Sequence, residues 1–354
     1  MKILNRYLVR SVISGALLAL FVLSLLDWVF GFLGQLDGSG KGGLSLAQIF
    51  LYSLYTEPQR MYELFPSSVL IGSIMSLGAM SANSELIAMR AAGVSIGGVV
   101  RAVLRAGIVM VCVAVALGEW LAPAGENKAQ ALKLAVQAGS TVIASEQDVW
   151  ARDGSRYIHI GHVLPNHQLR DVSIYEVNGA NRLEAVIRAQ SAVYVNKGWR
   201  LKQVEVSRFS ADQVQVKRYA ELAQSTLVQP TLFGLLDTRP RDMGAVALAR
   251  YIGYLKSNGL DAARYELAFW QRFTTPLSAL VMLLLAVPFV FGSLRSGGAG
   301  QRLFIGVLVG IGFYFVNRLM GQAGLVYGVS PLLSASFPLI LFAIAGLLAL
   351  RRLR

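Results

Sequence analysis

Charged and polar side chains inside long apolar runs are the first candidates for chemistry in this chain. Asp27 lies near the far end of the first apolar run, and Asn317 and Arg318 lie within the fifth. Such side chains are costly against lipid, so we expect them to face a cavity or a protein partner. A role in substrate binding and a structural role, as a buried pair or a snorkelling arginine, both remain open at this point.

Other basic residues lie at a similar depth. Arg60 precedes the second run, and Lys128 and Lys133 lie on a helix expected over residues 125–138, after the third run. Together with Arg318 they would form a basic rim above an apolar chamber, which suits anionic headgroups. Isolated lysines that face solvent are the alternative.

A twelve-residue segment between the second and third runs, residues 84–95, has the pattern of a short helix on the membrane surface. It begins with a serine in the N-cap position and an acidic first turn, and it ends at Gly93. The helix is too short to span, and an exposed methionine with a charge at each end suits the docking of a cytosolic partner. An ordinary loop is the alternative. The residues of this predicted docking surface are Ser84, Glu85, Leu86, Met89 and Arg90.

The motifs do not indicate an enzyme site. The glycine-rich stretch 38–43 lacks the phosphate-loop spacing, because Lys41 is followed by glycine instead of Ser or Thr. His159 and His162 are three apart on an expected strand and so point to opposite faces, and no metal-binding motif accompanies them. We therefore expect no metal, no cofactor and no catalytic residue in this chain.

The apolar runs define the fold class. Of the 354 residues, 55% are apolar, and several runs approach or exceed the roughly 20 residues needed to cross a bilayer. Gly306, Gly310 and Gly312 in the fifth run would let another helix approach closely. We expect a membrane protein with six transmembrane helices, three before and three after one outer domain. The expected spans are Ser11–Leu33, Met61–Ala82, Ala106–Pro123, Phe273–Gly292, Leu303–Gly328 and Pro331–Leu350.

The net charge of +13 follows membrane topology and does not indicate a nucleic-acid partner. Basic residues gather in four segments, among which Glu85 is the one acid. With six spans all four segments lie on one side, and the positive-inside rule identifies that side as the cytoplasm. Both termini are then cytoplasmic and the large domain lies outside. The basic residues are Lys2, Arg6, Arg10, Arg90, Arg101, Arg105, Arg295, Arg302, Arg351, Arg352 and Arg354.

Residues 141–229 have a different pattern, which defines the outer domain. Short alternating segments with turn signals, including a hairpin around Asp153-Gly154, predict antiparallel strands without intervening helices. We expect a sandwich or roll, followed by a helix over residues 242–257. The expected divisions of the chain are 1–123 for the first three spans with the short helix 84–95, 124–266 for the outer domain with flanking helices, and 267–354 for the last three spans.

Several short motifs occur at distinct topological positions. They are Ser84-Glu85-Leu86 with Gly93, Gly118-Glu119-Trp120 through Pro123 with Gly125-Glu126, Tyr265-Glu266 with Trp270, Phe291-Gly292 with Leu294-Arg295-Ser296, and Val326-Tyr327-Gly328. In order and position these motifs resemble the LptF/LptG permease family, the membrane subunits of the lipopolysaccharide-export ABC transporter of Gram-negative bacteria. The resemblance covers essentially the whole chain and is closer to the LptG branch than to the LptF branch.

This resemblance implies a fold, partners and an activity. The outer domain would be a periplasmic β-jellyroll, and the chain would extract lipopolysaccharide from the periplasmic leaflet of the inner membrane. Its partners would be a dimer of the ATPase LptB, which binds ATP and Mg, the second permease LptF and the carrier LptC. Glu85 would engage the ATPase, and spans one and five would line the lipid chamber. Basic residues that some members carry near the outer end of span one are replaced here by Asp27, Gly31 and Asp37.

The cost of moving a lipid agrees with an energy-driven extractor. Each methylene transferred to water costs about 0.8 kcal/mol, so an acyl chain of about a dozen carbons costs on the order of 10 kcal/mol. Alternative functions are an LptF-type subunit of the same transporter or an ATP-independent secondary lipid transporter, which would show ionisable residues near the midplane. The candidate wall residues of the chamber, for which helix packing is the alternative role, are Phe32, Leu64, Phe65, Val309, Phe313 and Met320.

Overall fold

The computed structural model consists of two compact units. The helical unit comprises Met1–Gly139, Pro240–Ala249 and Ala263–Arg354, and the sheet unit comprises Ser140–Arg239 and Arg250–Ala262. The boundaries expected at residues 124 and 266 fall inside continuous helices. The structure describes residues 2–38, 45–139, 149–164, 168–178, 182–195, 198–210, 213–224, 239–291 and 298–352.

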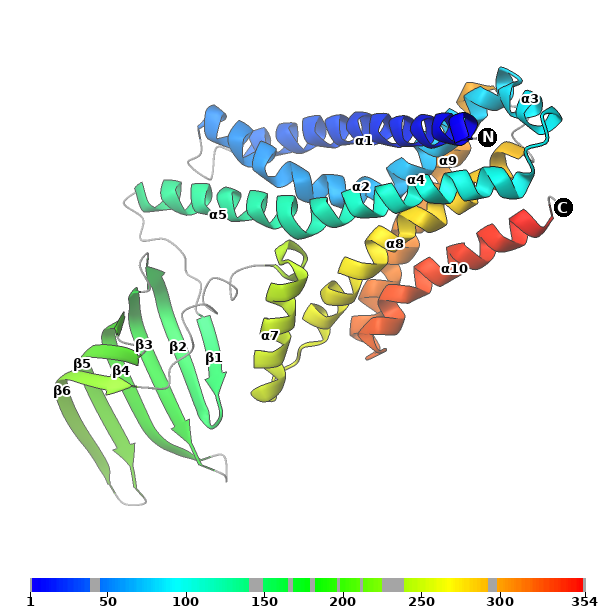
Figure 1. Cartoon of the computed structure of the whole chain (residues 1–354). Coiled ribbons are helices and arrows are strands. Elements are labelled where there is room, and N and C mark those ends of the chain that lie inside the picture. The colour runs from blue at the N-terminus through cyan, green and yellow to red at the C-terminus, as the bar shows by residue number, and fades with distance from the viewer. Residues whose placement is uncertain are drawn as a thin grey trace. The chain divides into compact units, whose positions relative to one another are not determined.

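Six helices in the described part of the chain are long and apolar enough to cross a membrane, as the sequence predicts. One of them joins α4 (Ile96–Ala116) to α5 (Ala122–Gly139) through a single π-helical turn, η2 (Leu117–Leu121). The short helix α3 (Glu85–Ala91) lies at the end of the helical unit that also holds both chain termini (Figure 1). The other five long helices are α1 (Lys2–Gly38), α2 (Leu46–Ala82), α8 (Ala263–Phe291), α9 (Ala299–Val326) and α10 (Pro331–Arg351).

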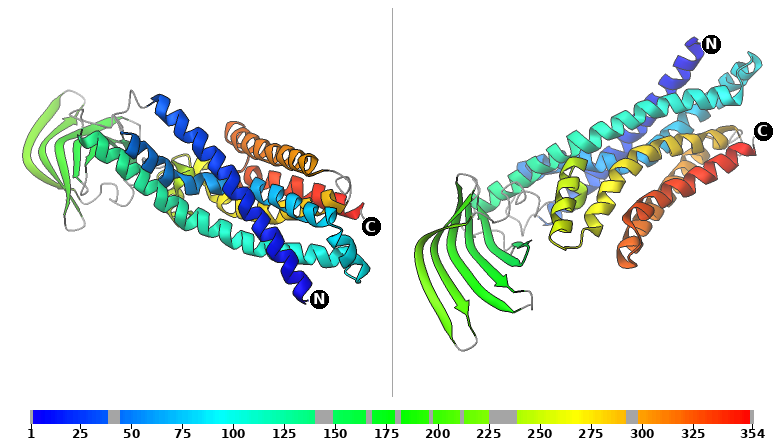
Figure 2. Two further views of the ribbon diagram at one scale, coloured as in Figure 1. Left: turned by 90° about the horizontal axis from the view of Figure 1, so that it is seen from above. Right: turned by 60° about the horizontal axis from the view of Figure 1, so that its bottom comes forward.

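The central helix of this unit is α2. In its most apolar stretch 67% of the residues are buried, against 17% in α1 and 17% in α9. Both α1 and α9 pack on α2, while α8 packs on α2, α4 and α10. Figure 2 shows α1 running obliquely across the neighbouring helices. The two peripheral helices α1 and α9 therefore each leave a long face uncovered by this chain.

The crossing of α1 and α2 has no room for a side chain at Gly15 or Gly72. A methyl group on Gly15 would lie 2.7 Å from the Gly72 carbonyl oxygen. One turn away, the Ser76 hydroxyl donates to the Ser11 carbonyl oxygen at 2.6 Å. In lipid no hydrophobic force drives helices together, so close backbone approach and such hydrogen bonds hold the pair.

Two glycines of α9 make a similar approach to α2. A methyl group on Gly306 would lie 3.5 Å from the Ile71 Cα, and Ser67 donates its hydroxyl to the Gly310 carbonyl oxygen at 3.3 Å. The expectation that small residues in this run admit another helix is confirmed at these two positions. It is wrong for Gly312, because no atom lies within 4 Å of the position its Cβ would take.

The sheet unit contains one antiparallel sheet whose described strands follow each other in chain order. The expected hairpin at Asp153-Gly154 is confirmed, with Gly154 in the left-handed conformation at φ 58°. The sheet is curved (Figure 1). Buried Ile158, Ile174 and Ile187 lie side by side on one of its faces. The strands are β1 (Val149–Asp153), β2 (Arg156–Leu164), β3 (Gln168–Val177), β4 (Leu183–Val195), β5 (Gly198–Phe209) and β6 (Val214–Gln224).

This topology confirms the antiparallel β domain. A jellyroll closes two sheets around one core, whereas the described strands pair only with their chain neighbours and form a single sheet. The expected jellyroll connectivity is therefore not found among the described strands. Residues 140–148 and 225–238, on which the remainder of such a roll would depend, lie outside the described residues.

Helix α7 (Ala245–Ser257) contributes its C-terminal part to the sheet unit. The Tyr254 hydroxyl donates to the Arg152 carbonyl oxygen at 3.0 Å, and the Asn258 side-chain oxygen accepts from the Gly154 amide at 3.1 Å. Partial burial raises the pKa of the Tyr254 hydroxyl, so it remains a donor at neutral pH. These contacts hold the β1–β2 hairpin against the end of the helix.

The α1–α2 crossing is testable by two matched substitutions on one helix. Gly15→Ala introduces a methyl group against the α2 backbone, whereas Gly34→Ala meets no atom within 4 Å. Overpacking of this kind costs about 1–3 kcal/mol. We expect Gly15→Ala to lower the thermal unfolding midpoint of the purified protein in detergent by several degrees relative to Gly34→Ala. Equal midpoints for the two variants would contradict the crossing.

Candidate functional site

The short helix α3 is fastened to the helical unit by its apolar face. Leu86 is 2% exposed and Met89 is 6% exposed, and both belong to the main core. The prediction of an exposed Met89 on a docking surface is therefore wrong. A seven-residue helix has little hydrogen bonding of its own, so its apolar side chains are needed to hold it against the bundle.

The two ends of α3 differ from each other in how well the sequence predicts them. Ser84 is left-handed at φ 60° and its side chain makes no capping hydrogen bond, so the N-cap prediction is wrong. Its amide instead donates to the Ser81 carbonyl oxygen in the turn that ends α2. The glycine stop is confirmed: Gly93 has φ 87°, and the Gly93 and Val94 amides donate to the Arg90 and Met89 carbonyl oxygens, each at 3.0 Å.

The polar side of α3 remains accessible. Glu85 is partly exposed and its carboxylate accepts a hydrogen bond from the Tyr7 hydroxyl of α1 at 2.9 Å. Ile87 is 47% exposed, and Arg90 is exposed as predicted. A partner could therefore contact a small surface with one apolar side chain, one cation and one carboxylate. We call the exposed residues Ile87, Ala88, Arg90 and Ala91 the outer face of α3.

Arg60 of α2, a predicted substrate cation, already has a partner in Asp27 of α1. Its guanidinium lies 3.1 Å from the Asp27 carboxylate, with side-chain exposures of 30% and 43%. Gly31 makes room for it, because a side chain there would overlap the guanidinium. Asp27 therefore takes part in a partly buried ion pair, the structural alternative considered from the sequence.

The other predicted cations lie on two helices, α5 and α9, and those with a contact have different partners. The Lys128 ammonium of α5 lies 5.7 Å from the centre of the Tyr55 ring of α2. Arg318 of α9 donates to the Tyr314 hydroxyl at 3.1 Å, one turn earlier on the same helix. Lys133 is exposed on α5. A single basic rim formed by these residues stays a prediction.

The candidate wall residues divide into buried and half-buried positions. Phe65 is 1% exposed in the core, and Phe313 is 6% exposed against Phe342 of α10, at 5.2 Å between ring centres. Both predictions as chamber wall are wrong, because these side chains fill the space between helices of the same chain. Phe32 stacks on Trp28 at 5.6 Å. The half-buried candidates, which remain available, are Phe32, Leu64, Val309 and Met320.

A face that sequence reasoning missed is the outward stripe of α9. Its large apolar residues recur at helical spacing on the side away from the glycines that contact α2, and each is at least 45% exposed. A comparable stripe runs along α1, where Phe21 is 62% exposed. Such faces suit acyl chains or an apolar helix of a partner. The glycines of α9 could have predicted the stripe, because the side opposite the glycines that contact another helix must face outward. The α9 residues are Phe304, Leu308, Ile311, Phe315 and Leu319.

A second feature that was missed is a buried arginine at the π-helical turn. Arg272 of α8 is 6% exposed and donates to the carbonyl oxygens of Gly118 at 2.6 Å and Arg241 at 2.5 Å. Its guanidinium also lies 5.3 Å from the centre of the Tyr62 ring. A π-helical turn disturbs the regular backbone hydrogen bonds, and here the arginine supplies donors to that region.

The Gly118-Glu119 motif acquires a structural explanation from this arrangement. A methyl group on Gly118 would lie 2.6 Å from the Tyr62 ring, so the position requires glycine. The Glu119 carboxylate accepts from the Ala245 amide at 2.9 Å and thereby caps the first turn of α7. The motif thus joins α2, α8 and the start of α7 at one point of the helical unit.

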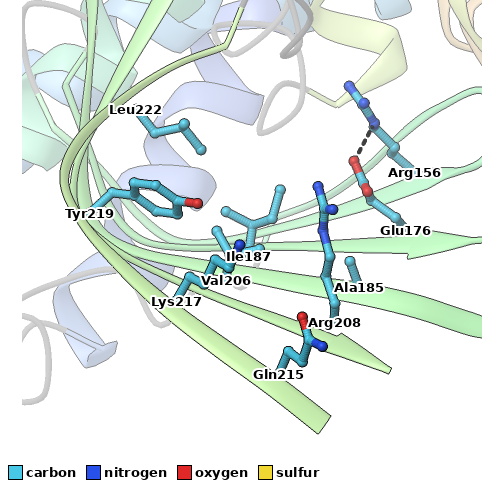
Figure 3. A pocket seen from close by; sticks show the side chains of 10 residues that line it. All are labelled: Arg156, Glu176, Ala185, Ile187, Val206, Arg208, Gln215, Lys217, Tyr219 and Leu222. Carbon is cyan, nitrogen blue, oxygen red and sulfur yellow. Dashed lines mark ion pairs between the residues drawn. The ribbon is translucent and has the colours of Figure 1, made fainter. Parts of the chain in front are cut away.

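The sheet unit carries a pocket of about 340 Å³ on its buried face (Figure 3). Arg156 and Glu176, paired at 2.9 Å, lie at its edge with Arg208, in one cross-strand row. Ile187 and Val206 form an apolar floor beside them. The pocket combines cations with apolar side chains, as an amphiphile with an anionic group would require. In the part of the chain that the structure describes, no group of His, Cys, Asp and Glu is placed to hold a metal ion.

Replacement of the buried arginine tests its role at the π-helical turn. Arg272→Leu keeps the volume but leaves two carbonyl oxygens without their charged donor, and such bonds are worth about 1.5–3 kcal/mol each. We expect the unfolding midpoint in detergent to fall strongly, whereas Arg318→Leu, at an exposed position of α9, leaves it nearly unchanged. Similar midpoints for both variants would show that the buried bonds do not stabilise the unit.

The sequence is similar to known proteins along nearly its full length. Residues 6–352 match the family described as lipopolysaccharide export system permease LptF/LptG. The identity to lipopolysaccharide export system permease protein LptG of Escherichia coli K12 is 32% over 353 residues, 99% of this chain and 98% of that protein. The identity to LptG of Haemophilus influenzae is 31%, over 96% of each chain. The identity to LptF of E. coli K12 is 24%, over 91% of this chain and 87% of that protein.

Proposed function

Because the chain belongs to the LptF/LptG family of lipopolysaccharide export system permeases, we propose that it is the LptG-type permease subunit that extracts lipopolysaccharide from the membrane. The match over residues 6–352 is the observation that carries this proposal. It includes the helical unit, with α3 and the outward stripes of α1 and α9, and the sheet unit. The higher identity to LptG than to LptF favours the LptG-type subunit.

The proposed orientation follows from charge. This is a multi-pass membrane protein, and the end with α3 and both termini is rich in arginine, including exposed Arg90, Arg101 and Arg105. The positive-inside rule then assigns this end to the cytoplasm and the sheet unit to the periplasm, with the chain in the inner membrane. Lipopolysaccharide would leave from the periplasmic leaflet and pass to a periplasmic carrier.

The proposed partners each correspond to a different surface. A dimer of an LptB-type ATPase, which binds ATP and Mg, would contact the outer face of α3 and Glu85. The apolar stripes of α1 and α9 would face the lipid chamber and a second, LptF-type permease. The sheet unit would deliver the lipid toward an LptC-type carrier. Energy from ATP is needed because each acyl chain costs on the order of 10 kcal/mol to remove from lipid.

A pull-down from bacterial membranes tests the proposal most directly. The tagged full-length chain, purified in mild detergent, should copurify with an ATPase, with a second permease of the same family and with lipopolysaccharide, identified by mass spectrometry. Recovery of the intact chain without any ATPase would contradict the proposal. That outcome would favour an ATP-independent lipid transporter.

Glu85 is the most informative single residue in the reconstituted transporter. We expect Glu85→Ala to abolish lipopolysaccharide release from proteoliposomes while lipid still copurifies with the complex, because the chamber is remote from α3. Tyr7→Phe separates the two contacts of Glu85: it removes the hydroxyl that ties α1 to α3 but keeps the carboxylate for a partner, so we expect release to fall less than in Glu85→Ala. If Glu85→Ala and Glu85→Lys both release lipid normally, α3 does not transmit ATP-driven motion to the lipid chamber.

A further inference from the structure

We propose that Arg302 is a positioning residue that fastens α9 to the last turns of α2, so that a movement of α3 reaches the apolar stripe of α9. This inference rests on the proposed function. It concerns a side chain that the sequence assigns to a cytoplasmic loop, as one of the positive-inside residues. The structure instead buries it inside the helical unit, at 5% exposure.

Arg302 contacts α2 both through its guanidinium and through the aliphatic part of its side chain. The Arg302 guanidinium donates through Nη1 to the Gly78 carbonyl oxygen. Gly78 is also the residue over which the side chain passes, because a methyl group there would lie 2.6 Å from the Arg302 Cδ. Any other residue at this position would displace the arginine. The chain thus provides both an acceptor and the space for a buried cation.

The position of this contact along α2 is what relates it to α3. Gly78 lies four residues before Ala82, the last residue of α2, and α3 begins at Glu85. A cation is favoured near a helix C-terminus by the carbonyl dipoles that point out of it. On its own helix, Arg302 lies in the first turn of α9, which begins at Ala299. A displacement of α3 therefore acts close to the point where α9 is attached.

The packing of α9 makes this attachment important. Only 17% of its most apolar stretch is buried. Val309 and Phe313 pack in the main core, whereas at Gly306 and Gly310 α9 meets α2 without a side chain of its own. Of the two charged residues of α9, Arg302 is buried and Arg318 is exposed. Loss of the Arg302 contact would remove the hydrogen bond that attaches the start of α9 to the last turns of α2, next to α3.

A second contact connects α3 to the other peripheral helix. Tyr7 of α1 donates to the Glu85 carboxylate at 2.9 Å. The two helices with outward apolar stripes, α1 and α9, are thus both tied to the short region between Gly78 and Glu85. A single movement in this region can therefore change the separation of the two stripes.

The test uses the complete transporter, in which this chain is reconstituted with its ATPase and second permease in proteoliposomes that contain lipopolysaccharide. We expect Arg302→Gln and Gly78→Ala to reduce ATP-dependent lipid release at least tenfold while ATP hydrolysis stays within about twofold of wild type. Arg302→Lys, which keeps a donor and the charge, should restore part of the release. Gly312→Ala is the matched control on α9, since its methyl group meets no atom within 4 Å.

A spectroscopic measurement separates transmission from a merely structural role. Spin labels at Leu18 of α1 and Leu308 of α9, both exposed, report the separation of the stripes in a background where the single cysteine, Cys112, is replaced by serine. In wild type the distance distribution should change between the nucleotide-free and the vanadate-trapped complex. In Arg302→Gln this change should be lost although nucleotide is still trapped.

Three results have distinct meanings. Normal lipid release by Arg302→Gln and Gly78→Ala, with the wild-type distance change, overturns the inference and leaves the proposed function intact. Loss of hydrolysis, release and complex assembly together in both variants also overturns it, because the contact would then only hold the fold. Absence of ATP-dependent lipid release by the wild-type complex contradicts the proposed function itself. If the complex with Arg302→Gln alone fails to assemble, lipid release and the distance change are judged on Gly78→Ala, which retains the arginine.

Discussion

Close packing against α2 is the constraint on which the rest of the helical unit depends. In lipid, apolar burial does not pull helices together, so α1 and α9 stay on α2 through glycine contacts and a few hydrogen bonds to backbone oxygens. Gly15 with Gly72, and Gly306 and Gly310 with α2, make these contacts. Small residues occupy the points of closest approach, and many large apolar residues of α1 and α9 lie outward, whereas Leu8, Leu20 and Phe313 are buried in the core. The same constraint therefore holds the unit together and produces its uncovered stripes.

Buried arginines complete the unit where helix geometry is interrupted. Arg272 donates to carbonyl oxygens at the π-helical turn η2, and Arg302 donates to one near the end of α2. Inside an apolar unit a guanidinium must have acceptors, and a backbone carbonyl oxygen has two lone pairs, so it can accept from an arginine as well as from its own helix. Each arginine joins two elements through backbone carbonyl oxygens. Both therefore act as cross-links whose removal would affect two elements at once.

Local features of this fold could be predicted from the sequence, but the inward face of each helix could not. The six spans, the Asp153-Gly154 hairpin and the glycine stop of α3 follow from length, turn chemistry and backbone freedom, which depend on near neighbours in the chain. The burial of Met89, Phe65 and Phe313 cannot be predicted from the sequence, because an apolar helix has no sequence signal that distinguishes its inward face before its neighbours are known. Arg302 was assigned to a loop since its charge is normal there, and only the space above Gly78 shows otherwise.

Three of the four cations predicted to meet an anionic headgroup already have a contact within this chain, and the fourth, Lys133, is exposed. Arg60 is paired with Asp27, Lys128 lies over Tyr55, and Arg318 donates to Tyr314 of its own helix, α9. A phosphate that approached Arg60 would have to compete with a carboxylate 3.1 Å away, and like charges repel. Binding of a phosphate at Arg60 therefore requires a movement of α1 that separates Asp27 from Arg60. Since α1 is tied to α3 through Tyr7, a movement of α3 that displaces the stripes would also move Asp27.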